Sequence, residues 1–202
     1  MKIHDIFGPG SNREERILYD YNVLHEKVEA CKKLGLHIVL TSGTYDMKHI
    51  GHERYLERAR EQGDLLIVGV DNDKKTSKRK GPHRPINHED ERTEALCHTR
   101  HVDLVFLKQE TDEHWQLIRT VQPDVLVLTA GSGYSSDDLK ALEKYCKKIM
   151  VLEPQATTST TAKIRKALLA PADEIKNRLR EAVNEVCGYV DKVTGNNGEN
   201  NE

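Results

Sequence analysis

Short continuous apolar runs alternate with amphipathic stretches along most of this chain. The runs predict strands at 37–41, 64–71, 102–107, 125–129 and 148–152. Their uninterrupted apolar character is typical of strands that are covered on both faces. Apolar residues at helical spacing between the runs predict helices at 53–60, 88–100, 111–121 and 136–147. Strands that alternate with helices predict an α/β fold with a Rossmann-like parallel sheet.

Further helices flank this predicted core. Residues 1–12 look like a loop, and apolar residues from Ile17 to Cys31 follow at helical spacing until Gly35. We therefore predict four regions, which are an N-terminal helical extension (1–36), a core domain (37–170), a C-terminal helix (171–194) and a disordered tail (195–202). The apolar faces of the two flanking helices need cover, either from their own domain or in a homodimer.

The segment from Gly43 to His52 carries the strongest functional signal. It joins a predicted buried strand to a predicted helix through a glycine turn. Two histidines, His49 and His52, lie three residues apart and therefore share one face of the helix start. Backbone N–H groups of the turn and the positive end of the helix favour an anion there, which predicts a phosphate site.

This segment resembles the HxGH signature of the nucleotidyltransferase superfamily. The family pattern is a strand followed by Gly-x-Phe-Asp-x-x-His-x-Gly-His, and this chain differs only by Tyr45 in the Phe position. The resemblance implies that His49 and His52 are catalytic and bind nucleotide phosphates. It likewise implies nucleotide contacts for Gly43, Thr44 and Tyr45. Asp46 and Lys48 are expected on the substrate side, although a role for Asp46 in shaping the turn is equally open.

A basic segment carries the second resemblance. Lys80-Gly81-Pro82-His83-Arg84-Pro85-Ile86, with Arg92 downstream, resembles the Lys-Gly-x-x-Arg-Pro loop of heptose-phosphate adenylyltransferases. The resemblance implies a catalytic role for Lys80, substrate binding by Arg84 and nucleotide binding by Arg92, because cations suit phosphate oxygens. Residues 72–87 are predicted to form a loop, and three of its other cations are interpreted as solvated: Lys74, Lys75 and Arg79.

Two later segments bear on the nucleotide. Ser159, Thr160 and Thr161 open a predicted helix and resemble the family's hydroxyl motif, which implies phosphate contacts, although helix N-caps have the same composition. Thr129 and Gly131, after the fourth predicted strand, are expected to bind nucleotide, but the family's Gly-Gly-Asp turn is absent there. The Arg-Thr-x-Gly-Ile run of cytidylyltransferases is absent as well, which argues against CTP.

The resemblance implies a nucleotidyl transfer from a nucleoside triphosphate to a phosphorylated, sugar-like small molecule. We expect ATP as donor, with Mg²⁺ carried by the triphosphate and no metal-ligating side-chain cluster. CTP with glycerol 3-phosphate or a related polyol phosphate is the alternative, and adenylylation of a flavin mononucleotide is a third. A catalytically silent nucleotide-binding regulatory module is the alternative from another class.

Composition narrows the setting. The net charge of −2 with interspersed acids and bases predicts no nucleic-acid partner and no membrane surface. No apolar run approaches the roughly 20 residues of a membrane span, and the N-terminus does not resemble a signal peptide. Four cysteines without CxxC spacing are typical of a reducing cytoplasm. The single tryptophan, Trp115, is interpreted as a packing residue on a helix face.

Overall fold

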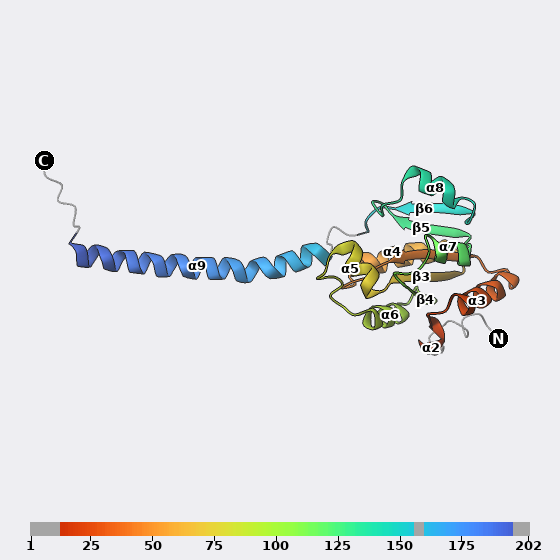
Figure 1. Cartoon of the computed structure of the whole chain (residues 1–202), viewed down its shortest axis with the longest axis horizontal. Coiled ribbons are helices and arrows are strands. Elements are labelled where there is room, and N and C mark those ends of the chain that lie inside the picture. Colours follow the sequence, from red (N-terminus) through yellow and green to blue (C-terminus); the bar gives the residue numbers. More distant parts are fainter. Residues whose placement is uncertain (1–12, 156–159, 196–202) are drawn as a thin grey trace. The chain divides into compact units, whose positions relative to one another are not determined.

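The computed structural model describes residues 13–155 and 160–195, and the chain divides into two compact units at residues 157 and 158. The first unit contains a six-stranded parallel sheet with the order β1-β4-β3-β2-β5-β6 (Figure 1). Its strands are β1 (Ile17–Leu18), β2 (Ile38–Gly43), β3 (Leu65–Asp71), β4 (Leu104–Lys108), β5 (Val125–Thr129) and β6 (Lys148–Leu152). This architecture confirms the predicted Rossmann-like α/β class.

Helices cover both faces of the sheet. Successive residues of each strand point to opposite sides, so they belong to two separate core clusters. Leu40 and Ile67 belong to the core cluster under α3, α7 and α8, whereas Val39 and Val68 belong to the cluster under α4 and α6. The helices of this unit are α2 (Arg13–Arg16), α3 (Tyr21–Lys33), α4 (Ile50–Arg60), α5 (Asp73–Lys80), α6 (Glu89–Cys97), α7 (Gln116–Val121) and α8 (Ser136–Leu142).

The N-terminal segment is part of the sheet unit and not a separate extension. The predicted helix is present as α3, and its residues Leu24, Val28 and Cys31 are buried in the core. Residues 17–18, which the helical spacing had included, instead form β1 and pair with β4. This segment supplies both an edge strand and part of one helical layer.

The segment 72–87 also differs from its prediction. It contains a two-turn helix, α5, where the polar composition predicted a loop. The side chain of Asn72 caps this helix by accepting a hydrogen bond of 2.8 Å from the N–H of Lys75. Helices α6, α7 and α8 are all shorter than the ranges that the apolar spacing predicted.

The order of the strands has a switch point at β2. Strand β3 pairs with one edge of β2, and β5 pairs with the other. Ligands of open parallel sheets bind beside such a switch point, at the carboxyl ends of the strands. Gly69 permits close packing near this end, since a Cβ there would lie 2.4 Å from Leu117 Cδ2.

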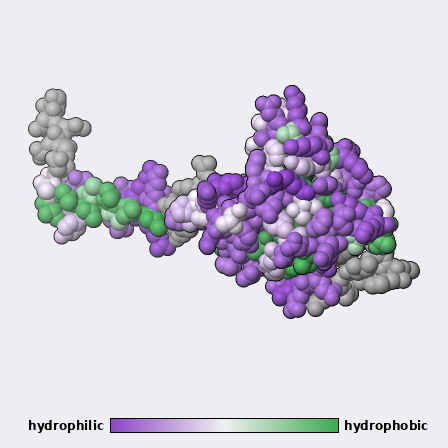
Figure 2. Space-filling model, turned by 45° about the vertical axis from the view of Figure 1, so that its right-hand side comes forward, coloured by the Kyte–Doolittle hydropathy of each residue, from purple (hydrophilic) through white to green (hydrophobic). Residues whose placement is uncertain are grey.

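The second unit is formed by the long helix α9 (Thr160–Thr194). This helix includes the range 171–194 that was predicted as a C-terminal helix, and it begins earlier than residue 171. Figure 2 shows apolar residues along this helix. Apart from Gly195, the predicted disordered tail lies outside the described residues. Within the ranges that the structure describes, no helix has both the length and the apolar character to cross a membrane.

Candidate functional site

The turn after β2, which we call the signature turn (residues 43–49), has an unusual backbone. Tyr45 and Met47 both have left-handed conformations, with φ values of 54° and 48°. Tyr45 is only 6% exposed and its ring covers Gly43, where a Cβ would lie 3.0 Å from the ring. Because left-handed backbone is costly for residues other than glycine, packing around Tyr45 must hold the turn in place. Tyr45 therefore shapes the site from within the core.

The two signature histidines are fixed at the start of α4. His49 is the N-cap, and its Nδ1 accepts a hydrogen bond of 3.1 Å from the N–H of Gly51. His52 Nδ1 accepts a hydrogen bond of 3.2 Å from the N–H of His49. An imidazole that accepts at Nδ1 carries its proton on Nε2 when it is neutral. Both rings, whose centroids are 4.1 Å apart, are thus oriented as Nε2 donors.

Arg92 lies beneath the signature turn with a side chain that is almost fully buried. Its guanidinium donates to the carbonyl oxygens of Thr44 at 2.6 Å, Asp71 at 2.8 Å and Asn87 at 3.0 Å, and to the carboxylate of Asp73 at 2.8 Å. These bonds tie together the ends of β2 and β3. Arg92 was predicted to bind nucleotide, but the structure directs its hydrogen bonds to the protein itself.

Asp46 ties the signature turn to the loop that follows α5. Its carboxylate accepts hydrogen bonds from Arg84 at 2.7 Å and from the N–H groups of Ile86 and Asn87 at 3.0 Å each. Burial opposes ionisation of Asp46, but these hydrogen bonds outweigh it and lower its pKa. Asp46 and Arg84, predicted to bind substrate, are thus partners of each other.

Lys48 contacts residues of α4 and α6. Its ammonium group donates to the carbonyl oxygen of Ala95 at 3.1 Å and pairs with Glu53 at 2.7 Å. It also contacts the hydroxyl of Thr99. These contacts attach the signature turn to α6, and the substrate contact of Lys48 stays a prediction.

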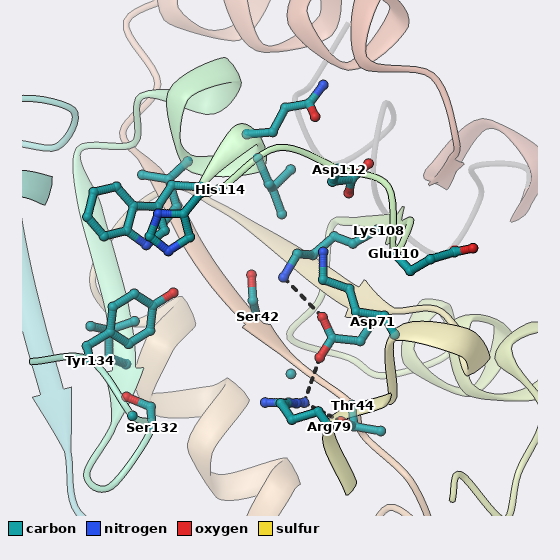
Figure 3. Close-up of a pocket in the computed structure, with 18 of the residues that line it drawn as sticks. Ser42, Thr44, Asp71, Arg79, Lys108, Glu110, Asp112, His114, Ser132 and Tyr134 are labelled. Carbon is teal, nitrogen blue, oxygen red and sulfur yellow. Dashed lines mark hydrogen bonds and ion pairs between the residues drawn. The ribbon is translucent and has the colours of Figure 1, made fainter. Parts of the chain in front are cut away.

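A cavity of about 740 Å³ opens at the carboxyl ends of the strands beside the switch point (Figure 3). Ser42, Gly43 and Thr44 line it from β2 and the signature turn, and Thr129 lines it from β5. One side is strongly basic, and we call it the cationic wall. It consists of Lys75, Lys78, Arg79, Lys80 and Lys108.

Asp71 is the anchor of the cationic wall. Its carboxylate is paired with Arg79 at 2.6 Å and with Lys108 at 3.1 Å (Figure 3). Arg79 also donates to the hydroxyl of Thr44 at 2.7 Å, which connects this wall to the signature turn. Residues 43–44 thus line the cavity and belong to the same turn as His49. The two histidines themselves do not line the cavity.

In the described part of the chain no carboxylate pairs with the other three cations of the wall, although Lys75 donates a hydrogen bond of 2.9 Å to the carbonyl oxygen of Gln109. Burial, followed by the charge of Lys108, lowers the pKa of Lys75. Partial desolvation, followed by the charges of Arg79 and Arg84, lowers the pKa of Lys80. The ammonium group of Lys80 makes no hydrogen bond or ion pair with any residue in the described part of the chain. Crowded cations with lowered pKa values favour the binding of an anion such as a phosphate.

The other predicted nucleotide contacts are Gly131 and three hydroxyl residues. Gly131 does not line the cavity, although Ser132 and Gly133 of the same turn do. Ser159 lies outside the described residues, and Thr160 and Thr161 belong to the second unit. The phosphate contacts of these three hydroxyl residues stay a prediction.

The sequence interpretation missed several residues of the cavity. Lys75 and Arg79 were taken as solvated, but α5 places them with Lys78 on one helical face that borders the cavity. The signal for this arrangement was Asn72, an N-cap residue immediately after a strand. Lys74, whose side chain is 80% exposed, is on the outside of α5 as expected for a solvated lysine.

Comparison with known proteins is consistent with this geometry. The cytidylyltransferase-like family model matches residues 40–167. Proteins called bifunctional protein HldE are 38% identical over 156 residues in Ectopseudomonas mendocina and 42% identical over 134 residues in Pseudomonas entomophila. The matches cover 75% and 64% of this chain but only 32% and 28% of those relatives. The chain therefore matches less than one third of their length.

Solved structures show the same fold. The lipopolysaccharide core biosynthesis protein from Thermoplasma volcanium superposes with a TM-score of 0.51 and 25% identity, over 59% of this chain and 97% of that one. A pantoate-beta-alanine ligase from Francisella tularensis gives a TM-score of 0.52 over 68% of this chain and 66% of that one. Its 18% identity indicates a shared fold only.

The contacts of Arg92 predict a structural role that stability measurements can test. Arg92→Ala leaves buried carbonyl oxygens and Asp73 without their donor, so the free energy of unfolding should fall by about 3–5 kcal/mol. Lys74→Ala, on the exposed side of α5, should change it by less than about 0.5 kcal/mol. Urea denaturation of both variants measures the difference. A loss below about 1 kcal/mol for Arg92→Ala would show that its buried contacts do not stabilise the fold.

Proposed function

The chain belongs to the cytidylyltransferase-like family, and on that premise we propose that it transfers a nucleoside monophosphate to a phosphorylated, sugar-like acceptor. The observation that carries the proposal is the pair of histidines with both Nδ1 atoms occupied by backbone N–H groups. Two imidazoles held as Nε2 donors at a helix start suit phosphate oxygens of a triphosphate. Residues 43–44 connect the histidines to the cavity, and the cationic wall of that cavity suits the acceptor phosphate.

In the proposed reaction an acceptor phosphate oxygen attacks the α-phosphorus of the triphosphate. A new P–O bond forms while the bond to the bridging oxygen of the β-phosphate breaks, and pyrophosphate leaves with the bonding electrons. Such a reaction depends on alignment and charge stabilisation, without a covalent protein intermediate. His49 and His52 would stabilise charge on the nucleotide phosphates, and Lys80 with Arg79 would align the acceptor phosphate.

We propose that the triphosphate enters as its Mg²⁺ complex. In the described part of the chain no three His, Cys, Asp or Glu side chains form a group that could hold a metal ion. The ion would therefore be held mainly by oxygens of the triphosphate itself, as Mg²⁺ commonly is in phosphoryl-transfer sites. What the protein contributes is a set of donors and cations around the phosphates.

The histidine geometry predicts a large effect on turnover. His52→Ala removes an Nε2 donor and should lower kcat by about 10²–10³-fold while the fold is retained. His52→Gln, whose amide nitrogen can replace Nε2, should recover part of the loss, and His98→Ala, at an exposed site, should leave kcat unchanged. Steady-state assays of pyrophosphate release with circular dichroism as a fold check measure this. Wild-type turnover in a folded His52→Ala variant would disprove the mechanism.

We propose ATP as the donor nucleotide. After β6 the chain has no Arg-Thr-x-Gly-Ile run; Pro154 lacks an N–H group, and the Gln155 amide donates to the carbonyl oxygen of Glu153 at 2.7 Å. Adenine could instead be held by backbone groups of the turn at 129–133. CTP with glycerol 3-phosphate is the second candidate, supported by the matching family description.

Competition between nucleotides tests this choice. With equal ATP and CTP and one working acceptor, adenylylated product should exceed cytidylylated product at least about tenfold, or about 1.4 kcal/mol. Mass spectrometry of the products gives the ratio. An excess of cytidylylated product would support the CTP alternative and leave the histidine mechanism unchanged, whereas nucleotide binding without any product would support a silent regulatory module.

We also propose that α9 forms a homodimer with a second copy of the chain. Six residues follow the 4-3-4-3-4 spacing of a coiled coil: Ile175, Leu179, Ala182, Val186, Tyr189 and Val193. Acidic and basic residues are mixed between 175 and 194, which suits a protein partner better than an anionic membrane surface.

Light scattering tests the proposed dimer. The wild-type chain should have twice the monomer mass of 23.0 kDa, and Leu179→Asp with Val186→Asp should reduce it to the monomer mass. Arg180→Asp, outside the heptad seam, serves as the control and should remain dimeric. A wild-type protein that is monomeric at micromolar concentration would contradict the proposal.

A further inference from the structure

Trp115 has a backbone conformation that bulky residues rarely adopt. Its φ of 58° and ψ of 20° lie in the left-handed region, and α7 begins at the next residue. The carbonyl oxygen of Trp115 accepts a hydrogen bond of 2.9 Å from the N–H of Arg119, which connects this residue to α7. Such a conformation costs on the order of 1–3 kcal/mol and persists only where the surroundings hold it. Strain of this kind at the edge of a cavity points to a functional role.

Two other rings accompany Trp115 at the cavity. His114 stacks on the indole with ring centroids 4.2 Å apart and an interplanar angle of 29°. Trp115 and Tyr134 both pack against the core cluster under α3, α7 and α8, and all three residues line the cavity. We call His114, Trp115 and Tyr134 the aromatic wall. In Figure 3, His114 and Tyr134 lie apart from Asp71 and Arg79, so the aromatic and charged parts of the cavity are separated.

The carboxylates around the aromatic wall already have donors within the protein. Asp112 accepts hydrogen bonds from the hydroxyl of Tyr21 at 2.7 Å and from the N–H of Gln109 at 2.9 Å. Asp138 accepts from the N–H and the hydroxyl of Ser135 at 2.8 Å each. These oxygens can accept further hydrogen bonds from ligand hydroxyls, but their charge is already partly compensated. The arrangement favours a polyhydroxylated ligand over a cationic amine.

We propose that the aromatic wall binds the ring of a cyclic sugar phosphate, and that Trp115 separates such acceptors from linear polyol phosphates. A sugar ring offers an apolar C–H face that can stack on the indole and a hydroxyl rim that can reach the carboxylates. Its phosphate would then lie on the cationic wall, across the cavity. A glycerol phosphate has no comparable ring face. This inference rests on the proposed function, since it specifies the acceptor of that reaction.

Because the chain contains one tryptophan, its fluorescence reports directly on this wall. The full-length protein without triphosphate is titrated with glucose 1-phosphate, mannose 1-phosphate, glycerol 3-phosphate and inorganic phosphate. At least one of the two sugar phosphates should change the Trp115 emission in a saturable manner, and the other two probes should not. Sugar phosphate binding that is detected by calorimetry but leaves the emission unchanged would overturn the proposal.

Variants test whether Trp115 sets the preference. Trp115→Ala should raise the dissociation constant for the responding sugar phosphate by about tenfold or more in calorimetry, with Trp115→Phe recovering much of the affinity. Binding of ATP should be unchanged, and Tyr19→Ala, an exposed aromatic outside the cavity, should bind like wild type. Equal affinity of Trp115→Ala and wild type would overturn the proposal. Binding is measured without turnover, so a sugar phosphate that binds here but is never converted would contradict the proposed function alone.

Discussion

A buried guanidinium group organises the carboxyl edge of the sheet. Arg92 donates hydrogen bonds to the carbonyl oxygens of Thr44 and Asp71, which lie at the ends of neighbouring strands. Its charge is compensated by Asp73. A buried cation is tolerated only where its donors are used, so these bonds constrain the backbone on both sides of it. The left-handed residues Tyr45 and Met47 follow directly after Thr44, and the two histidines complete the turn. The geometry proposed for catalysis therefore depends on a residue that does not itself face the cavity.

The site has two regions that share the end of β2. On the α4 side, backbone N–H groups occupy the Nδ1 atoms and leave the imidazoles oriented as Nε2 donors. On the other side, Asp71 holds Arg79 and Lys108, while burial and then neighbouring cations lower the pKa values of Lys75 and Lys80. An attack between two phosphorylated substrates needs such separate regions, because each substrate brings negative charge that must be compensated before the reacting atoms can approach.

Much of the fold could be predicted from the sequence, because continuous apolar runs identify buried strands and the signature identifies the turn beside the switch point. The site was harder to predict. Arg92 and Lys80 are both cations in a basic region, and the sequence does not reveal that one faces carbonyl oxygens and the other the cavity. Helix α5 was missed because all of its residues are polar and its start is signalled only by Asn72 and the acidic Asp73 in its first turn. Trp115 and Tyr134 come together only through folding, since different connections supply them.

In the proposed reaction the α-phosphate of a nucleoside triphosphate moves to an acceptor phosphate. The most direct test uses ATP labelled with ³²P at either the α- or the γ-position, together with Mg²⁺ and a panel of sugar phosphates. We expect the α-label in a new nucleotide-sugar product and the γ-label in pyrophosphate, in equal amounts and only with an acceptor. Release of the γ-label as inorganic phosphate, with the α-label left in ADP, would contradict it.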